Sequence, residues 1–249
     1  MEICEKGEIF IEKDDDLVFD HTKIILRTDG EYFYAKTNQR IFRSSIDING
    51  LATIRIPADN VWPLADPEFT RAPDPLPSTA YVKRPSLLYY ENASNNPDYA
   101  CQILTEVKTC EVLRKHPHHN IVQYLGCIVK DGRIKGLAFA KYSITLSQML
   151  KDGTRFNRSR CLHGIQAGVS HMHKLGLVHN DLNPSNIMMD EDNPVIIDFD
   201  SCKREGDKLG SKGGTYGWTL DGEDYARREN DFYSLEKIRA ALMKDSTKC

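Results

Sequence analysis

The stretch from His179 to Cys202, HNDLNPSNIMMDEDNPVIIDFDSC, constrains this chain more than any other part of its sequence. Asp181 and Asn186 stand five positions apart in a loop that follows a predicted helix. Two apolar runs around the turn Glu191-Asp192-Asn193 predict a β-hairpin, which would fold Asp198 back toward Asn186. Carboxylate and amide oxygens suit a hard cation such as Mg²⁺ that also keeps phosphate oxygens. A carboxylate beside that cation can orient a hydroxyl group and accept its proton.

Composition excludes several classes of partner. The chain has 249 residues, 28% of them charged, a net charge of −3 and no long basic stripe, so we expect no nucleic acid as partner. No run of 18 apolar residues occurs, so we expect no membrane partner, and the N-terminus MEICEKGEIF does not resemble a signal peptide. The seven scattered cysteines form no CxxC pair, which favours reduced thiols and an intracellular location, cytoplasmic or nuclear.

The rest of the sequence predicts strands first and helices later. Asp29-Gly30, between two apolar runs, predicts an early hairpin because glycine accepts a positive φ. Six prolines from position 57 to position 77 predict an ordered or semi-extended connector, because proline is excluded from helix interiors and central strands. Apolar periodicity predicts helices at 99–115, 158–175 and about 230–243, and strands at 7–13, 23–27, 32–36, 52–56, 79–84, 120–127 and 134–142. This order predicts an α+β fold with a β-rich first part.

Two motifs in the first stretch resemble those of protein kinases. The residues HNDLNPSN resemble the kinase catalytic loop HRDLxxxxN, and Asp198-Phe199-Asp200 resembles the DFG motif that follows it. The resemblance implies that Asp181 is the catalytic base and that Asn186 and Asp198 are Mg²⁺ ligands. Two motifs in the right order at the right separation make this a specific signal.

Further resemblances lie upstream. The residues AYVK, ending at Lys83, resemble the strand whose lysine holds the ATP phosphates, and Glu106 on the next helix resembles its ion-pair partner, with Glu111 in reserve. The passage HPHHNIVQYLG resembles the kinase segment HPNIVxxxG. If Lys141 and Tyr142 form the hinge, they bind ATP as well.

The resemblance covers about residues 79–240 and is strongest to small kinase-domain proteins of filamentous fungi. It implies a two-lobed protein-kinase-like fold. On this interpretation residues 63–142 form the N-lobe and residues 143–249 form a shortened, mainly helical C-lobe. Residues 1–62 are a β-rich segment that either completes the N-lobe or forms a small extra module.

Four departures from the kinase pattern stand out. No GxGxxG loop precedes Lys83. Asn180 replaces the arginine that meets an activation-loop phosphate, so we expect no switching by loop phosphorylation. Asn183 replaces a lysine that contributes positive charge, and Asp200 replaces the DFG glycine, which suggests a more fixed loop.

The sequence therefore leaves three functions open. The first is an ATP- and Mg²⁺-dependent phosphotransferase acting on protein serine and threonine. The second is a pseudokinase that binds a nucleotide or a regulatory protein partner, which the missing glycine loop favours. The third is a small-molecule kinase, because aminoglycoside and choline kinases carry a similar HGDLxxxN loop and an IDFD-like metal motif.

Overall fold

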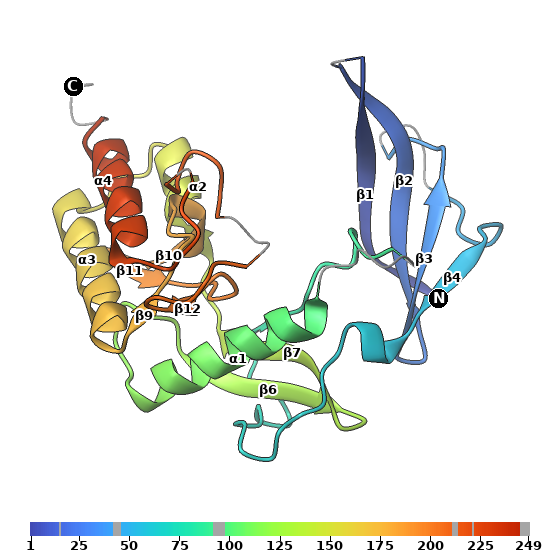
Figure 1. Ribbon diagram of the computed structural model, residues 1–249, viewed down its shortest axis with the longest axis horizontal. Helices are drawn as coiled ribbons and strands as arrows, with labels where there is room; N and C mark the ends of the chain where they lie inside the picture. Colours follow the sequence, from blue (N-terminus) through green and yellow to red (C-terminus); the bar gives the residue numbers. More distant parts are fainter. Residues whose placement is uncertain (15, 42–45, 92–97, 211–213, 221, 245–249) are drawn as a thin grey trace. The chain divides into compact units, whose positions relative to one another are not determined.

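The computed structural model describes the whole chain except residues 15, 42–45, 92–97, 211–213, 221 and 245–249 (Figure 1). The chain divides into two compact units, one of residues 1–63 with 84–101 and the other of residues 64–83 with 102–249. No helix within the described ranges combines the length and the apolar character needed to cross a bilayer.

The first unit is built on a four-stranded antiparallel sheet. Its strands are paired in sequence order and are β1 (Glu2–Lys13), β2 (Asp16–Thr28), β3 (Glu31–Thr37) and β4 (Thr53–Ile56), followed by the 3₁₀ turn η1 (Ala58–Asn60). Asp29 and Gly30 form the predicted hairpin turn between β2 and β3, both with positive φ. Ile24, Leu26 and Ala35 form a buried core on this sheet.

An unusual buried lysine lies in the same unit. Lys23 is 1% exposed, its ammonium group donates to the carbonyl oxygen of Tyr90, and it lies 4.9 Å from the centroid of the Tyr34 ring. Tyr90 comes from the returning segment 84–101 and accepts a hydrogen bond on its hydroxyl from Asn60 at 2.8 Å. Burial lowers the pKa of Lys23, Lys36 lowers it further, and Glu91 opposes the shift.

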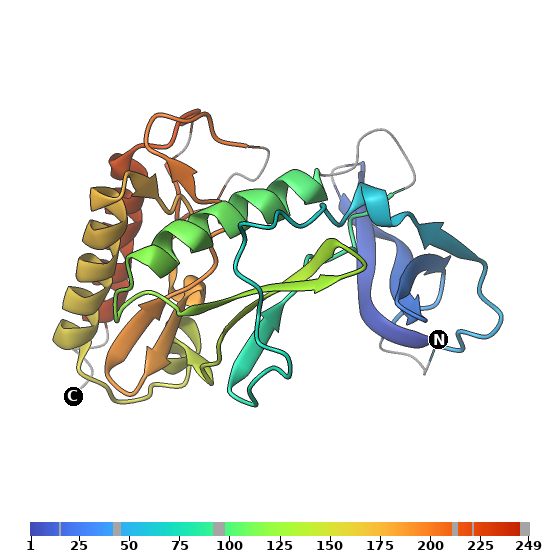
Figure 2. The same ribbon diagram turned by 90° about the horizontal axis from the view of Figure 1, so that it is seen from below.

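The second unit begins with a small sheet and a helix beside it. The sheet has the order β5-β7-β6, from β5 (Ala80–Lys83), β7 (Arg133–Ala140) and β6 (Tyr124–Lys130), and α1 (Tyr99–Lys115) runs alongside it (Figures 1 and 2). Residues 70–72 lie along β6: the Cys127 amide donates to the Thr70 carbonyl at 2.7 Å. A Cβ at Gly126, where φ is 130°, would lie 2.5 Å from the Ala72 nitrogen, so this approach requires glycine.

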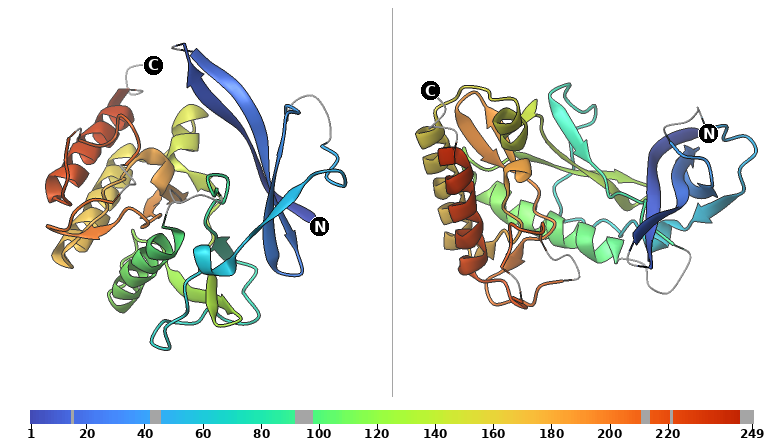
Figure 3. Two further views of the ribbon diagram at one scale, coloured as in Figure 1. Left: turned by 45° about the vertical axis from the view of Figure 1, so that its right-hand side comes forward. Right: turned by 90° about the horizontal axis from the view of Figure 1, so that it is seen from above.

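The remaining elements form a mainly helical part (Figure 3). They are β8 (Ile144–Thr145), α2 (Leu146–Lys151), α3 (Arg158–Lys174), β9 (Leu177–Val178), η2 (Pro184–Asn186), β10 (Ile187–Asp190), β11 (Asn193–Ile196), β12 (Lys203–Arg204) and α4 (Arg228–Lys244). α3 packs on α4 and on β11, and its buried residues include Ile165, Val169 and Met172. The loops of residues 179–186 and 197–202 connect the strands of the β10–β11 hairpin and the β9–β12 pair.

Candidate active site

Lys83, Glu106 and Asp198 meet at one point although they come from three separate parts of the second unit. The Lys83 ammonium lies 2.7 Å from Glu106 Oε1 and 2.7 Å from Asp198 Oδ1. Lys83 ends β5, and Glu106 lies on α1, whose apolar stripe of Ile103, Val107, Cys110 and Leu113 is buried. The structure therefore brings together the lysine and glutamate that the sequence pairs, and adds Asp198.

A third carboxylate joins this cluster. Asp200 Oδ2 lies 3.7 Å from the Lys83 ammonium, so one cation faces three acidic groups. Burial lowers the pKa of Lys83, but the carboxylates of Glu106, Asp198 and Asp200 outweigh that effect and hold it well above its usual range. Burial also raises the pKa of Glu106, against the attraction of Lys83. Lys83 is therefore charged at every physiological pH, and the cluster of this lysine with three carboxylates has a net negative charge.

The loop after β9 holds Asp181 and Asn186 side by side. Asn186 Nδ2 donates to the Asp181 carbonyl at 2.9 Å and to its carboxylate oxygen Oδ2 at 3.0 Å. The other carboxylate oxygen, Oδ1, accepts from the Thr215 amide at 2.7 Å and from Asn183 Nδ2 at 3.2 Å. Asn183 also donates to the Thr215 hydroxyl at 3.2 Å. Asp181 is thus a carboxylate oriented by two loops.

The β10–β11 hairpin places Asp198 beside Asn186, as the sequence predicts. Ile187 pairs with Ile196, and the Ile197 amide donates to the Asn186 carbonyl at 3.0 Å. Because the Asn186 amide nitrogen faces Asp181, its side-chain oxygen is the end left for a cation. Asp198 has φ of 64°, a left-handed conformation that is uncommon for a residue other than glycine and that occurs often at functional sites.

One amide oxygen and one carboxylate on neighbouring residues are a donor set suited to Mg²⁺, which takes one or two protein oxygens and fills its other positions with water and phosphate. A surplus of negative charge around Lys83 favours a divalent cation at the same place. No group of three or more histidine, cysteine or acidic residues in the described ranges has the arrangement of an all-protein metal site. The residues present therefore fit a shared, phosphate-dependent Mg²⁺ rather than a metal held by protein alone.

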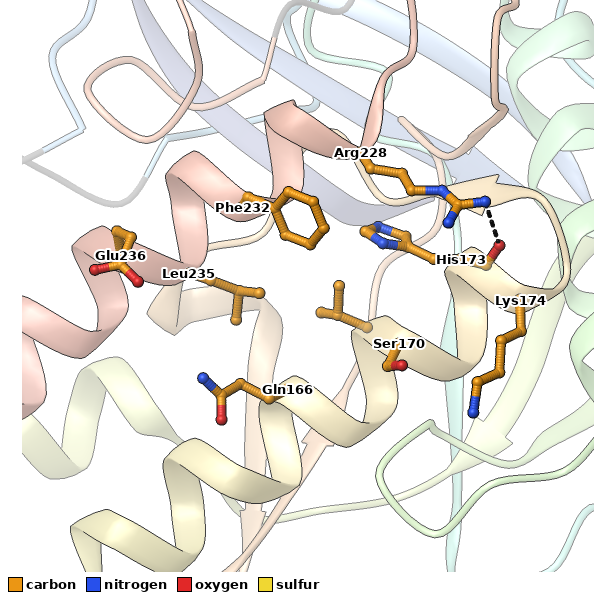
Figure 4. A pocket seen from close by; sticks show the side chains of 9 residues that line it. Gln166, Ser170, His173, Lys174, Arg228, Phe232, Leu235 and Glu236 are labelled. Carbon is orange, nitrogen blue, oxygen red and sulfur yellow. Dashed lines mark hydrogen bonds between the residues drawn. The ribbon is translucent and has the colours of Figure 1, made fainter.

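A residue of α4 fixes the backbone of the loop that leads to Asp181. Asp231, fully buried, accepts from the backbone amides of His179 at 3.0 Å and Asn180 at 2.9 Å. His173 on α3 lies 2.8 Å from the same carboxylate. His173 lines a cavity of about 510 Å³ between α3 and α4. Arg228 donates to the His173 carbonyl oxygen, as Figure 4 shows. His179 is fully buried.

The remaining predicted residues, Lys141, Tyr142 and Glu111, lie outside the cluster around Lys83. The Lys141 amide donates to the Thr79 carbonyl at 2.8 Å, which ties the segment after β7 to the start of β5, and Tyr142 is half-buried. Glu111 lies away from Lys83 and accepts from the amide and hydroxyl of Thr70 at 2.7 and 2.9 Å. Glu106, and not the reserve candidate Glu111, is therefore the partner of Lys83.

Sequence reasoning gave no place in the site to three residues. The motif comparison treats Asp200 only as a replacement for glycine and Asn183 only as a replacement for lysine, and it assigns no role to Thr215. Asp200 faces Lys83, and the other two touch Asp181. An amide at position 183 and a carboxylate at position 200, each two residues from Asp181 or Asp198, are the signal in the sequence that could have identified Asn183 and Asp200.

The β5-β7-β6 sheet, the adjacent helix α1 and the loops around Asp181 and Asp198 together define a kinase-type fold and site. The sequence matches the family model for the protein kinase domain over residues 88–247, more than half of its 249 residues. The chain belongs to the protein kinase family. Asp181, Asn186 and Asp198 lie inside the matched range, and Lys83 lies five residues before it.

Curated relatives are kinases of several kinds. The chain is 36% identical over 89 residues to a probable serine/threonine-protein kinase, irlC, of Dictyostelium discoideum, covering 33% of this chain and 6% of that protein. It is 27% identical over 150 residues to the serine/threonine-protein kinase/endoribonuclease IRE1 of Hypocrea jecorina, covering 55% of this chain and 11% of that protein. The matched stretches are therefore small parts of much longer relatives.

Among solved structures, the chain is similar to one in the yeast RNA Pol II CTD kinase CTDK-1 complex. The TM-score is 0.48 at 18% identity, and the match covers 61% of this chain and 51% of that one.

Proposed function

We propose that this chain is an ATP- and Mg²⁺-dependent phosphotransferase that acts on serine and threonine hydroxyls of proteins. The observation that carries this proposal is the position of the Lys83 ammonium, 2.7 Å from both Glu106 and Asp198. A lysine held by one carboxylate and adjacent to a second on the metal loop can neutralise phosphates next to a divalent cation. Lys141 and Tyr142 would bind the adenine side of the nucleotide.

The chemistry follows from the residues. Asn186 and Asp198 would hold Mg²⁺, which when bound supplies positive charge to the phosphate oxygens. Asp181 would orient the substrate hydroxyl and accept its proton as the hydroxyl oxygen bonds to the γ-phosphorus. The bond from the γ-phosphorus to the β–γ bridging oxygen breaks, and ADP carries away that electron pair. Lys83 would stabilise the charge on the phosphates throughout.

The relatives support a protein as the substrate. The kinases irlC and IRE1, to which parts of this chain are similar, are named as serine/threonine-protein kinases. Thr215, whose amide lies 2.7 Å from the Asp181 carboxylate, would have to move aside for a substrate hydroxyl to reach that base.

The experiment is a calorimetric titration of the full chain with a non-hydrolysable ATP analogue, with and without Mg²⁺. We expect saturation at one site that requires Mg²⁺ and that Asp198→Ala abolishes without unfolding the protein. Asp181→Asn should keep this binding but lose transfer of phosphate from ATP to protein. Unchanged binding in Asp198→Ala would refute the metal assignment, and surviving turnover in Asp181→Asn would mean that another base operates.

A nucleotide-binding pseudokinase is the second candidate, and two features favour it. Both oxygens of the Asp181 carboxylate already accept hydrogen bonds from the protein. Residues 70–72 lie along β6, so this part of the proline-rich segment runs beside the sheet rather than serving as a glycine loop over the phosphates. Mg²⁺-dependent binding with no turnover on proteins would favour this candidate, and turnover on small alcohols would favour a small-molecule kinase.

A further inference from the structure

Asn180, the residue immediately before Asp181, holds a demanding position. Its φ is 63°, in the left-handed region that asparagine tolerates better than most residues, and only 5% of its surface is exposed. Its backbone amide donates to the Asp231 carboxylate at 2.9 Å, so α4 fixes the backbone of Asn180. The direction of the next side chain, Asp181, depends on this conformation.

The Asn180 side chain uses both ends of its amide. Nδ2 donates to the carbonyl oxygens of Val178 and Ser201, each at 3.1 Å. Oδ1 accepts from Asn230 Nδ2 on α4 at 3.0 Å. Asn180, Val178, Ser201 and Asn230 are all buried, so these hydrogen bonds are shielded from competing water.

These partners belong to separate segments. Val178 ends β9, and Ser201 closes the loop that begins at Asp198, just before Lys203 of β12 pairs with Val178. Within that loop the Cys202 amide donates to the Phe199 carbonyl at 3.1 Å. The Asn180 carbonyl also packs closely on Gly214, where a Cβ would lie 2.6 Å from it. One residue thus touches the loop of Asp181, the loop of Asp198, α4 and the segment that contacts Asp181.

We propose that Asn180 is a positioning residue that couples the Asp181 loop to the Asp198 loop through its neutral amide, permanently and without a phosphate group. The proposal rests on the proposed phosphotransferase function, because it assigns Asn180 the task of keeping base and metal ligand in register. It makes the arrangement of the two loops a fixed property of the fold.

Side-chain chemistry restricts this role to an amide. The site needs two N–H donors for carbonyl oxygens and one acceptor for Asn230. Arginine has donors but no acceptor, and aspartate has acceptors but no donor when ionised. Glycine keeps the left-handed backbone but removes all three hydrogen bonds. Each substitution therefore fails in a different and separable way.

The kinetic test compares Asn180→Gly and Asn180→Arg with the wild type. We expect each to lower kcat about 10- to 100-fold, because hydrogen bonds that hold the two loops together are lost. The KM for ATP should stay within about 3-fold of the wild-type value, because Lys83 is untouched. The arginine variant restores the residue of the catalytic-loop motif yet should lose activity. Full kcat in either variant, or a loss confined to KM, would overturn the proposal.

The matched control is Glu191→Gly, which places glycine at an exposed left-handed position with φ of 53° in the β10–β11 turn. It should leave kcat unchanged, so that a loss in Asn180→Gly cannot come from backbone flexibility at a left-handed position alone.

A second measurement does not depend on turnover. Hydrogen exchange of the full chain should be faster in Asn180→Gly than in wild type both at residues 177–181 and at residues 198–204. Faster exchange at 177–181 alone would overturn the coupling, whatever the activity. If the wild type has no turnover but exchange rises in both segments, the proposed function fails and the coupling stands.

Discussion

Lys23 in the first unit is buried and Lys83 in the second is half-buried, and their surroundings are opposite. The partners of Lys23 are the Tyr90 carbonyl oxygen and the Tyr34 ring. Those of Lys83 are the carboxylates of Glu106, Asp198 and Asp200. Burial lowers the pKa of Lys23, whereas the carboxylates raise that of Lys83 despite its burial.

The difference separates two uses of a lysine. When a buried lysine faces neutral groups, its charged form is destabilised. Such a lysine contributes little to stability beyond the packing of its alkyl chain. An ammonium facing an excess of carboxylates stays charged, and its neighbours can bind a second cation when phosphates arrive. Lys83 thus has the environment of a phosphate-binding group, and Lys23 that of a structural residue.

The sharpest way to break this comparison is to remove the charge of Lys83. Lys83→Met leaves Glu106 buried without its cation, so we expect the second unit to lose about 3 kcal/mol of stability at neutral pH. The loss should be smaller in acid, where Glu106 takes up a proton. Phosphoryl transfer should fall more than about 100-fold, since the phosphates lose their lysine.

Denaturant unfolding followed at pH 5 and pH 8, with an ATPase or protein-phosphorylation assay, measures both effects. Equal destabilisation at the two pH values would mean that Glu106 is not the group left unpaired. Wild-type turnover would show that Lys83 has no part in the reaction.

A smaller effect is expected from Glu106→Gln. Glutamine still accepts a hydrogen bond from Lys83, but a neutral acceptor holds the ammonium less strongly than a carboxylate. We therefore expect about a tenfold loss of turnover with little loss of stability, because no charge is left buried alone. Affinity for the Mg²⁺–nucleotide analogue by calorimetry gives an independent measure.

Glu111→Gln is the control on the same helix. Glu111 accepts from Thr70 and not from Lys83, so its substitution should leave nucleotide affinity unchanged. Equal effects of the two substitutions would show a general perturbation of α1 rather than a specific contact with Lys83.

Much of the second unit was predictable because its signals are local. α1 at Tyr99–Lys115 has the predicted bounds, and α3 begins at the predicted Arg158. The kinase motifs also located the Lys83–Glu106 pair. These features depend on helical periodicity and motif spacing, both of which the sequence displays directly.

The remaining features depend on residues that are distant in sequence. β2 is buried at every residue from His21 to Leu26, so both faces of this part of the strand are covered and the alternation of a half-exposed strand is missing. One of the covering residues, Tyr90, is 67 positions from its partner Lys23. The partners of the Asn180 side chain lie up to 50 positions away. A single sequence shows the amide at position 180 but not the three groups that it joins.

Replacing Lys23 tests the other side of the comparison. Lys23→Met keeps an unbranched apolar chain and removes a charge that burial disfavours, so we expect the first unit to gain about 1 kcal/mol at neutral pH. In the wild type, the unfolded lysine binds its proton up to about pH 10.5 while the folded one releases it earlier. Stability of this unit should therefore rise with pH toward 10.5, and Lys23→Met should abolish that rise.

Trp62 provides the signal for this measurement. It is 3% exposed in the first unit and packs on Tyr32 with ring centroids 4.7 Å apart, so in a Trp218→Phe background its fluorescence reports the unfolding of that unit. Destabilisation by Lys23→Met would mean that the hydrogen bond to Tyr90 outweighs the cost of burying the charge.

The smallest effect is expected at Lys36, an exposed lysine of the first unit. Lys36 lies 3.2 Å from Glu91, with the two side chains 45% and 56% exposed. Water and salt screen this pair, so Lys36→Ala should change stability by less than about 0.5 kcal/mol, measured through Trp62 in the same background. Since Lys36 also lowers the pKa of Lys23, the variant should move the pH-dependent rise slightly toward higher pH. A large loss of stability in Lys36→Ala, persisting in high salt, would mean that exposure does not decide what a lysine contributes in this protein, and the contrast between Lys23 and Lys83 would then need another cause.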